Sequence, residues 1–315
     1  MSERLSENKI VLVTRKTRLD ELIVRFNTEL QARFYVEHLG ADFSDYQDED
    51  RCYKGALRAT QTILARLGRV QVVDRAFIPN FLFGPNDTVV ALGQDGLVAN
   101  VLKYLDGQPL LGVNPDPARW EGVLLPFAVG ELGEVVPAVF KQQRPIRQVT
   151  IAKAALNTGE VLYGVNDLFI GPKSHTSARY QLKIGARAES HSSSGIIVST
   201  GLGSSGWFRS ILAGASGIAA NLAGGKPQTP QKSERKMPWD ADYLYFSVRE
   251  PWPSKTSSAQ ITFGKITPKE PLQLTSQMPE HGVIFSDGIE HDFLAFNAGT
   301  LATITLADKK GQLVV

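Results

Sequence analysis

Residues Thr88–Gly96 read TVVALGQDG, an apolar run that leads into a turn with two glycines around a carboxylate. Leu97–Leu105 continues at once with a helical pattern, so a buried strand is expected to pass through the turn into a helix. Backbone N–H groups and the positive end of that helix would then converge beside Asp95. The turn indicates an anion-binding site with a candidate base, or a plain strand-to-helix turn in which Asp95 is the N-cap.

Around this turn, the first half of the chain alternates strand-like and helix-like segments. Apolar residues recur at four-residue spacing from Leu22 to Phe34 and predict one helix that ends at Gly40. Asp42–Asp50 holds five acids and predicts a solvated loop. A second helix is predicted from Tyr53 to Gly68, and strands are predicted at Lys9–Thr14, Val70–Val73, Thr88–Leu92 and Leu110–Val113. This alternation indicates a Rossmann-like α/β domain with a parallel sheet covered on both faces.

The second half changes character after about Gln143 and is mostly β. Only Trp207–Ala220 has a helical pattern, and Gly224–Pro238 is predicted to be a surface loop. Short β-type runs include Val149–Ala152, Glu160–Tyr163, Tyr180–Ile184, Gly195–Ser199, Tyr243–Val248, Gln260–Phe263 and Leu301–Leu306. We therefore expect an α/β domain over residues 1–143 and a β-rich domain over residues 144–315, whose last residues are candidates to pack back on the first domain.

Composition narrows the class of protein. The 315 residues carry 34 Lys and Arg against 32 Asp and Glu, a formal charge of +2, which argues against a general nucleic-acid binder. The single cysteine, Cys52, cannot form an internal disulfide. No stretch approaches the roughly 18 apolar residues of a membrane span, and no signal peptide is evident. A cytoplasmic protein without nucleic-acid or membrane partners is the simplest expectation.

Two further motifs suggest ligand contacts. Gly201, Gly203 and Gly206 form a G-x-G-x-x-G turn, but no acidic residue ends a second strand about 20 residues on, so a dinucleotide-binding Rossmann unit is rejected. The remaining expectation is that a ligand approaches this backbone closely. Asn166 and Asp167 are polar residues inside an apolar run, which favours either a turn or a ligand-facing site.

Charge is segregated along the second half. Lys173–Arg187 contains four basic residues and no acid, and is interpreted as a solvated strand face or a phosphate-attracting surface. The acids between Glu280 and Asp292 lie beside His281 and His291. A metal cluster is conceivable there, but Asp287-Gly288 is first interpreted as a hairpin turn.

Taken together, these motifs resemble the NAD kinase family, whose superfamily includes diacylglycerol kinases and phosphofructokinases. The G-G-D-G turn of that family resembles Gly93–Gly96, its Asn-Glu/Asp pair resembles Asn166-Asp167, and its Gly-rich strand-to-helix segment resembles Gly195–Trp207. Gly112–Gly122 and Phe246–Pro251 are similar to the branch that contains mitochondrial NAD kinases. The resemblance implies an NAD kinase/diacylglycerol kinase-like fold and assembly into a homodimer or homotetramer.

The resemblance also implies an activity, which is ATP-dependent phosphorylation of the adenosine ribose 2′-hydroxyl of NAD to give NADP, with Mg²⁺ brought by ATP and no metal held by protein ligands alone. Asp95 would be the general base. Gly93, Gln94, Gly96 and Asn114 would contact phosphate or nucleotide, and Asn166, Asp167, Ser205, Gly206 and Trp207 would bind NAD. Core packing is the alternative role of Trp207.

Three positions depart from the family pattern. Gln94 replaces the second glycine of the turn, Ser194 stands where many members carry an acid, and Leu202 replaces a small polar residue. If position 94 needs a positive φ, a Cβ there costs geometry. Two alternatives to an NAD kinase follow, namely a nucleotide-binding pseudokinase and a lipid or sugar kinase of the same superfamily.

Overall fold

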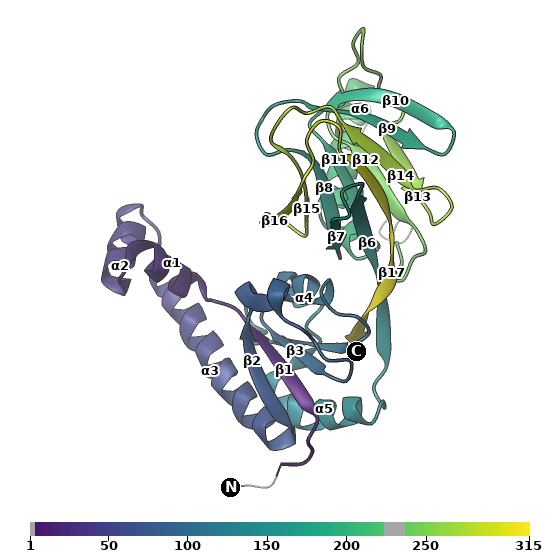
Figure 1. The fold of residues 1–315 in the computed structure, drawn as a ribbon. Coiled ribbons are helices and arrows are strands. Elements are labelled where there is room, and N and C mark those ends of the chain that lie inside the picture. Colours follow the sequence, from purple (N-terminus) through teal and green to yellow (C-terminus); the bar gives the residue numbers. More distant parts are fainter. Residues whose placement is uncertain (1–3, 224–236) are drawn as a thin grey trace. The chain divides into compact units, whose positions relative to one another are not determined.

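The chain is described by a computed structural model that covers residues 4–223 and 237–315 (Figure 1). It divides into two compact units, of which unit 1 holds Met1–Arg147 with Gln312–Val315 and unit 2 holds Gln148–Gly311. Most of the surface loop predicted at Gly224–Pro238 lies outside the described residues. Among the described helices, none combines the length and the hydropathy of a membrane-spanning helix.

Unit 1 is a parallel sheet with helices on both faces. Its elements are β1 (Lys9–Thr14), α1 (Arg18–Phe26), α2 (Glu29–His38), α3 (Ser44–Leu67), β2 (Arg69–Asp74), η1 (Arg75–Asn80), β3 (Thr88–Leu92), α4 (Asp95–Leu102), β4 (Pro109–Asn114), β5 (Phe127–Ala128), η2 (Val129–Glu131), α5 (Leu132–Phe140) and the end of β17 (Leu301–Val314). The strand order is β17-β4-β3-β1-β2, with β5 beside β4, and all these pairs are parallel. α3 and α5 pack on one face of the sheet and α4 lies on the other (Figure 1).

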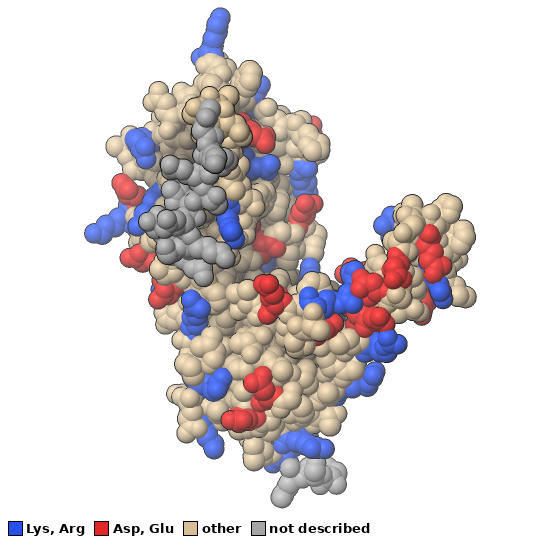
Figure 2. All heavy atoms as spheres, turned by 180° about the vertical axis from the view of Figure 1, so that it is seen from behind, with Lys and Arg blue, Asp and Glu red and all other residues tan. Residues whose placement is uncertain are grey.

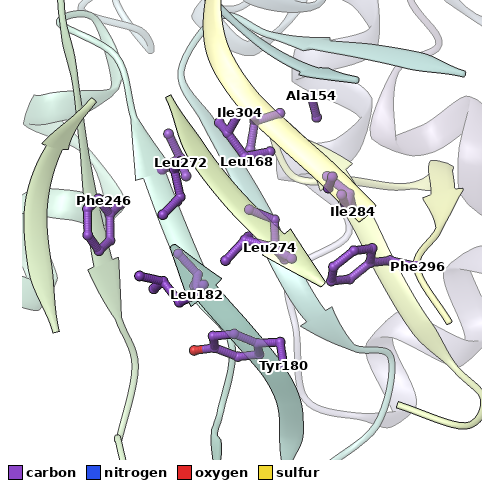
Figure 3. Close-up of a cluster of buried hydrophobic side chains, with 14 of the residues drawn as sticks. Ala154, Leu168, Tyr180, Leu182, Phe246, Leu272, Leu274, Ile284, Phe296 and Ile304 are labelled. Atoms are coloured by element: carbon purple, nitrogen blue, oxygen red, sulfur yellow. The ribbon is translucent and has the colours of Figure 1, made fainter. Parts of the chain in front are cut away.

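Unit 2 consists of two antiparallel layers of strands. Its elements are β6 (Ile146–Leu156), β7 (Val161–Gly164), β8 (Asp167–Pro172), β9 (Ala178–Ile184), β10 (Arg187–Ser193), β11 (Ile196–Ser199), η3 (Gly203–Ser205), α6 (Trp207–Leu222), β12 (Leu244–Val248), β13 (Phe263–Ile266), β14 (Leu272–Ser276), β15 (Gly282–Ser286), β16 (Ile289–Ala295) and most of β17. One layer has the order β13-β12-β11-β8-β15-β16, and the other joins β10, β9, β14, β17, β6 and β7. Their inner faces supply the core, in which Leu168, Leu182 and Phe246 are fully buried (Figure 3).

The single helix predicted to end at Gly40 is wrong, because two helices occupy that segment. α1 ends where Asn27 adopts a left-handed conformation with φ 67°, and Thr28 caps α2 by accepting a hydrogen bond from the Gln31 N–H. The apolar residues at that four-residue spacing are not all buried. Leu30 and Phe34 are 79% and 72% exposed, whereas Ala32 and Val36 are buried.

The solvated loop predicted at Asp42–Asp50 is also wrong, since α3 begins at Ser44 and Glu49 is only 2% exposed. The acids are accommodated because basic side chains pair with them. Glu49 pairs with Arg15 and Arg18, and Asp45 pairs with Arg18 and Arg119. Figure 2 shows Asp and Glu side chains gathered over α1–α3, with Lys and Arg side chains among them.

Most other predicted elements are confirmed, with shifted ends. The strand predicted at Thr88–Leu92 is β3, and the helix predicted to follow it begins earlier, at Asp95, and ends at Leu102. The helix predicted at Trp207–Ala220 is α6. The strand predicted at Gln260–Phe263 is misplaced, because β13 begins only at Phe263.

Candidate functional site

The turn after β3 presents the start of α4. Gln94 is the N-cap, and its carbonyl accepts hydrogen bonds from the Leu97 and Val98 N–H groups. Its φ of −116° and ψ of 164° are extended, so this position does not need the positive φ that favours glycine. A Cβ at Gly93 would lie 2.8 Å from Leu97 Cδ2, whereas one at Gly96 would meet no atom within 4 Å. A side chain at position 93 would therefore require the Leu97 side chain to shift, whereas one at position 96 would face open space.

The carboxylate of Asp95 is held in a defined orientation. It accepts hydrogen bonds from the Leu124 N–H at 2.7 Å and the Val123 N–H at 3.3 Å. These amides belong to residues 115–126, which we call the β4–β5 loop. A Cβ at Gly112 would lie 1.8 Å from the Leu124 carbonyl oxygen, so the loop lies directly against β4. Asp95 is itself half-exposed, so the carboxylate is fixed by the backbone yet accessible.

Asn114 ends β4 and shapes the same loop. Its Nδ2 donates to the Trp120 carbonyl at 2.9 Å, and its Oδ1 accepts from the Asp116 N–H at 3.0 Å. The side chain is 5% exposed. Its expected contact with nucleotide stays a prediction, because both ends of the amide are already engaged within the chain.

Sequence reasoning missed a buried cation beside the turn. Arg15 follows β1, and its side chain is only 9% exposed. A Cβ at Gly93 would lie 3.5 Å from Arg15 Cδ, so the two are neighbours. Arg15 pairs with Glu49 at 2.9 Å and lies over the ring of Tyr53. The available signal was its position, because the carboxyl ends of parallel strands share one edge of the sheet.

In unit 2, one carboxylate organises the Asn166-Asp167 segment. Asp287 accepts hydrogen bonds from the N–H groups of Val165 at 3.0 Å, Asn166 at 2.6 Å and Asp167 at 3.3 Å. Asp287 and Gly288 form the turn between β15 and β16, with φ 54° and 72°. The predicted hairpin turn is thus confirmed, but the role of Asp287 as a cap for three backbone amides was not foreseen.

Asp167 is 8% exposed and lies near the Asp287 charge. Burial, followed by repulsion from Asp287, raises the pKa of Asp167 from its ordinary value of 3.8 to about 7. Near neutral pH the group therefore exists both as a carboxylic acid and as a carboxylate. It can donate or accept a hydrogen bond, which suits a hydroxyl ligand.

Two of the three glycines after β11, Gly201 and Gly203, are required by close backbone packing, whereas a Cβ at Gly206 would meet only the Gly203 carbonyl oxygen, at 3.5 Å. A Cβ at Gly201 would lie 1.8 Å from the Pro238 carbonyl oxygen, and one at Gly203 would lie 1.9 Å from the Asn166 carbonyl oxygen. The chain's own backbone fills the space that the absent side chains leave. Gly203 thereby brings this turn against Asn166.

Ser205, Gly206 and Trp207 begin α6. Ser205 and Gly206 are exposed, and the Ser205 hydroxyl donates to the Leu202 carbonyl at 3.3 Å. Trp207 is half-buried and stacks on Phe169, with ring centroids 6.0 Å apart and an interplanar angle of 7°. This contact supports core packing as one role of Trp207.

A carboxylate is present near the position where Ser194 departs from the family pattern. The Ser194 hydroxyl donates to the Glu250 carboxylate at 2.5 Å, and Glu250 has a left-handed φ of 46°. The neighbouring Arg249 guanidinium lies 5.5 Å from the Trp207 ring centroid. A carboxylate, that of Glu250, therefore lies beside Ser194.

The basic run Lys173–Arg187 and the acids between Glu280 and Asp292 were considered as candidate ligand sites in unit 2. In β9 the basic Arg179 and Lys183 are exposed and alternate with buried Tyr180 and Leu182, as in a solvated strand face. Within residues 4–223 and 237–315, no group of three or more His, Cys, Asp or Glu side chains has the proximity that a metal site needs. The candidate residues thus fall into two groups, one around Asp95 in unit 1 and one around Asn166 in unit 2.

Comparison with known proteins gives a likeness in fold. No protein-family model and no curated protein matches the chain. A solved structure of yeast NADH kinase in complex with NADH is similar, with a TM-score of 0.56 and 15% sequence identity. The match covers 98% of this chain and 84% of the yeast chain. The chain therefore has an NAD kinase-like fold.

Proposed function

We propose that the chain is a phosphotransferase that transfers the γ-phosphoryl group of ATP to the 2′-hydroxyl of the adenosine ribose of NAD or NADH. The observation that carries this proposal is the Asp95 carboxylate, held by the Val123 and Leu124 amides at the start of α4. A carboxylate of fixed orientation next to a helix N-terminus combines a base with an anion-binding end. The fold shared with an NADH kinase supports the substrate class.

Asp95 acts as the general base in this proposal. Its carboxylate takes the proton of the 2′-hydroxyl while that oxygen attacks the γ-phosphorus. The bond between the γ-phosphorus and the bridging oxygen to the β-phosphorus breaks, and ADP leaves with the bonding electron pair. The open space at Gly96 leaves room for phosphate oxygens near the helix N-terminus. The protein's task is then mainly positioning and charge stabilisation.

The described residues fit a magnesium ion that arrives with the nucleotide. Mg²⁺ is commonly held by one or two carboxylates together with substrate phosphates and water, so it needs no cage of protein ligands. Asp95 is half-exposed and retains acceptor capacity beside its two amide contacts. When bound, the ion would neutralise charge on the transferred phosphoryl group.

Asn166 and Asp167 would bind the adenosine of the dinucleotide. Their backbone is fixed by Asp287 and by the close approach of Gly203. An Asp167 carboxyl with a pKa of about 7 can donate to or accept from a ribose hydroxyl. Ser205, Gly206 and the uncovered part of Trp207 would contact the same nucleoside.

Several finer assignments belong to this proposal. Motif detail in Gly112–Gly122 and Phe246–Pro251 favours the branch of mitochondrial NAD kinases. We also propose a homodimer or homotetramer and a cytoplasmic location. Gel filtration with light scattering tests the assembly, and a monomer at micromolar concentration would contradict it.

Activity with a panel of acceptors tests the proposed reaction. Purified protein with ATP and Mg²⁺ is expected to phosphorylate NAD or NADH, and not diacylglycerol or a sugar. Asp95→Asn is expected to abolish the product while circular dichroism stays unchanged, because the amide keeps the size of the side chain but is not a base. Polyphosphate in place of ATP tests the donor. Absence of NADP or NADPH, or equal rates in both proteins, would contradict the proposal.

A nucleotide-binding pseudokinase is the second candidate, and the half-exposed Gln94 side chain in the turn favours it. Because the backbone at Gln94 is extended and unstrained, any obstruction comes from its side chain. Gln94→Gly is expected to leave the fold intact. A large gain in NADP formation by this variant, with binding but no turnover in the wild type, would support the pseudokinase. Robust wild-type turnover would exclude it.

A further inference from the structure

A series of ion pairs connects the helices α1 and α3 to the β4–β5 loop. Glu49 lies between Arg15 and Arg18, and Asp45 lies between Arg18 and Arg119. The last ion pair of the series lies within the loop, where Arg119 Nε is 3.4 Å from Asp116 Oδ2. Asp45 joins a side chain of α1 to a side chain of the loop.

The Arg119 side chain reaches from the loop to α3. Its Nη1 donates to Asp45 Oδ1 at 2.6 Å, and its backbone N–H donates to the Asp116 carbonyl at 3.1 Å. Four residues further along the same loop, the Val123 and Leu124 amides hold the Asp95 carboxylate. The loop between these points makes a tight turn, with Gly122 at φ 66° and the Leu125 N–H bonded to the Gly122 carbonyl.

Backbone and side-chain contacts thus anchor the loop at its two ends. At one end Leu124 and Leu125 are 4% exposed and lie against β4. At the other end, two contacts tie the loop to α3, namely the ion pair of Arg119 with Asp45 and the Cys52 thiol, which donates to the Pro115 carbonyl at 3.5 Å. The pair is partly exposed, at 25% and 46% of the two side chains, so it is adjustable and not part of the rigid core.

We propose that Arg119 and Asp45 are positioning residues, which hold the β4–β5 loop on α3 and thereby orient the Asp95 carboxylate through the Val123 and Leu124 amides. Neither side chain touches the reacting groups in this proposal. The catalytic part rests on the proposed function, whereas the restraint on the two amides does not. In this proposal Asp45, at the acidic start of α3, holds the β4–β5 loop in place.

Amide hydrogen exchange tests the restraint without any activity. Arg119→Gln and Asp45→Asn are compared with wild type for exchange of the Val123 and Leu124 amides. A partly exposed ion pair accounts for about two- to fivefold in an opening equilibrium, so each variant should exchange faster by about that factor. The double variant should exchange more slowly than the product of the two single effects predicts, because both changes remove the shared Arg119–Asp45 pair.

The matched control is Arg51→Gln, which removes the exposed pair of Arg51 with Asp48 on the same helix. That pair makes no contact with the loop, so exchange at Val123 and Leu124 should stay at the wild-type rate. Arg119→Lys keeps the positive charge but offers one ammonium in place of the Nη1 and Nε contacts, so an intermediate rate is expected.

Kinetics test the catalytic part. Arg119→Gln and Asp45→Asn should lower kcat about two- to fivefold while KM for NAD stays unchanged, because the proposed NAD contacts lie elsewhere in the chain. A purely structural role would lower the melting temperature without this split between kcat and KM. Unchanged exchange, or faster exchange with unchanged kcat, would overturn the proposal. If the wild type forms no NADP, the proposed function fails and exchange alone decides whether the pair restrains the loop.

Discussion

Replacing Glu49 by Gln is expected to destabilise unit 1 strongly. The variant keeps the shape of the side chain but removes a charge that is 2% exposed. Arg15, itself 9% exposed, then loses the carboxylate that pairs with it at 2.9 Å. Breaking a buried ion pair by removing one partner costs about 3–5 kcal/mol. Because Arg18 is 39% exposed and remains hydrated, we expect the lower end, about 3 kcal/mol.

Hydrogen exchange of amides in α3 is the appropriate assay, because a chain with two units need not unfold in a single transition. A loss of about 3 kcal/mol corresponds to roughly 100-fold faster exchange of the slowest α3 amides. Glu37→Gln is the matched control. It removes a pair with Arg33 in which both side chains are about half-exposed, and should cost only about 0.3–0.5 kcal/mol. Equal effects of the two variants would refute the reasoning.

The same substitution has a defined pH dependence. Burial alone would raise the pKa of Glu49, but hydrogen bonds from Arg18 and Arg15 outweigh it and lower the pKa on balance. The ionised group therefore stabilises the fold above its unfolded pKa of about 4.3, and this stabilisation is lost as the pH falls through the lower folded value. The difference between wild type and Glu49→Gln should accordingly disappear in acid. A difference that persists below the folded pKa would contradict this account.

Two further predictions concern unit 2. Because the pKa of Asp167 rises from 3.8 to about 7, wild-type stability should fall as the pH increases from about 4 through 7, by up to about 4 kcal/mol. Asp167→Asn should lack this loss, and exchange of β8 amides at pH 5 and pH 8 measures it; the same pH dependence in both proteins would contradict the burial of an ionisable Asp167. Gly203→Ala should raise KM for NAD about tenfold or more, because its Cβ would lie 1.9 Å from the Asn166 carbonyl oxygen and displace that residue. Gly214→Ala on α6, whose Cβ would meet nothing within 4 Å, is the control, and an equal KM in both variants would count against the proposed role of Asn166.

Local sequence patterns predicted the elements next to the Gly93–Gly96 turn and the Asp287-Gly288 turn. The β3 strand, the helix after it and the hairpin at Asp287-Gly288 all have signals within a few residues, namely an apolar run, glycines and a polar turn pair. The fold class of unit 1 followed from the alternation of such segments. The break between α1 and α2 was missed although Thr28 is a good N-cap, because the apolar spacing runs through it.

Contacts between distant residues could not be predicted in this way. Glu49 lies 34 residues from Arg15, and Asp287 lies 121 residues from the Asn166 amide that it accepts from. A run of acids indicates solvation until its partners are known, which is why α3 was expected to begin later. For Gln94, the departure from the family glycine raised a question about backbone geometry, which the observed φ of −116° answers.

Isotope transfer tests the central claim most directly. The protein is incubated with NAD, Mg²⁺ and ATP labelled with ³²P at the γ-position, and the product is digested to locate the label. The account predicts labelled NADP with the phosphate on the adenosine ribose 2′-oxygen, and no labelled NADP with Asp95→Asn. Label that appears only as inorganic phosphate, or labelled NADP formed equally by Asp95→Asn, would contradict it.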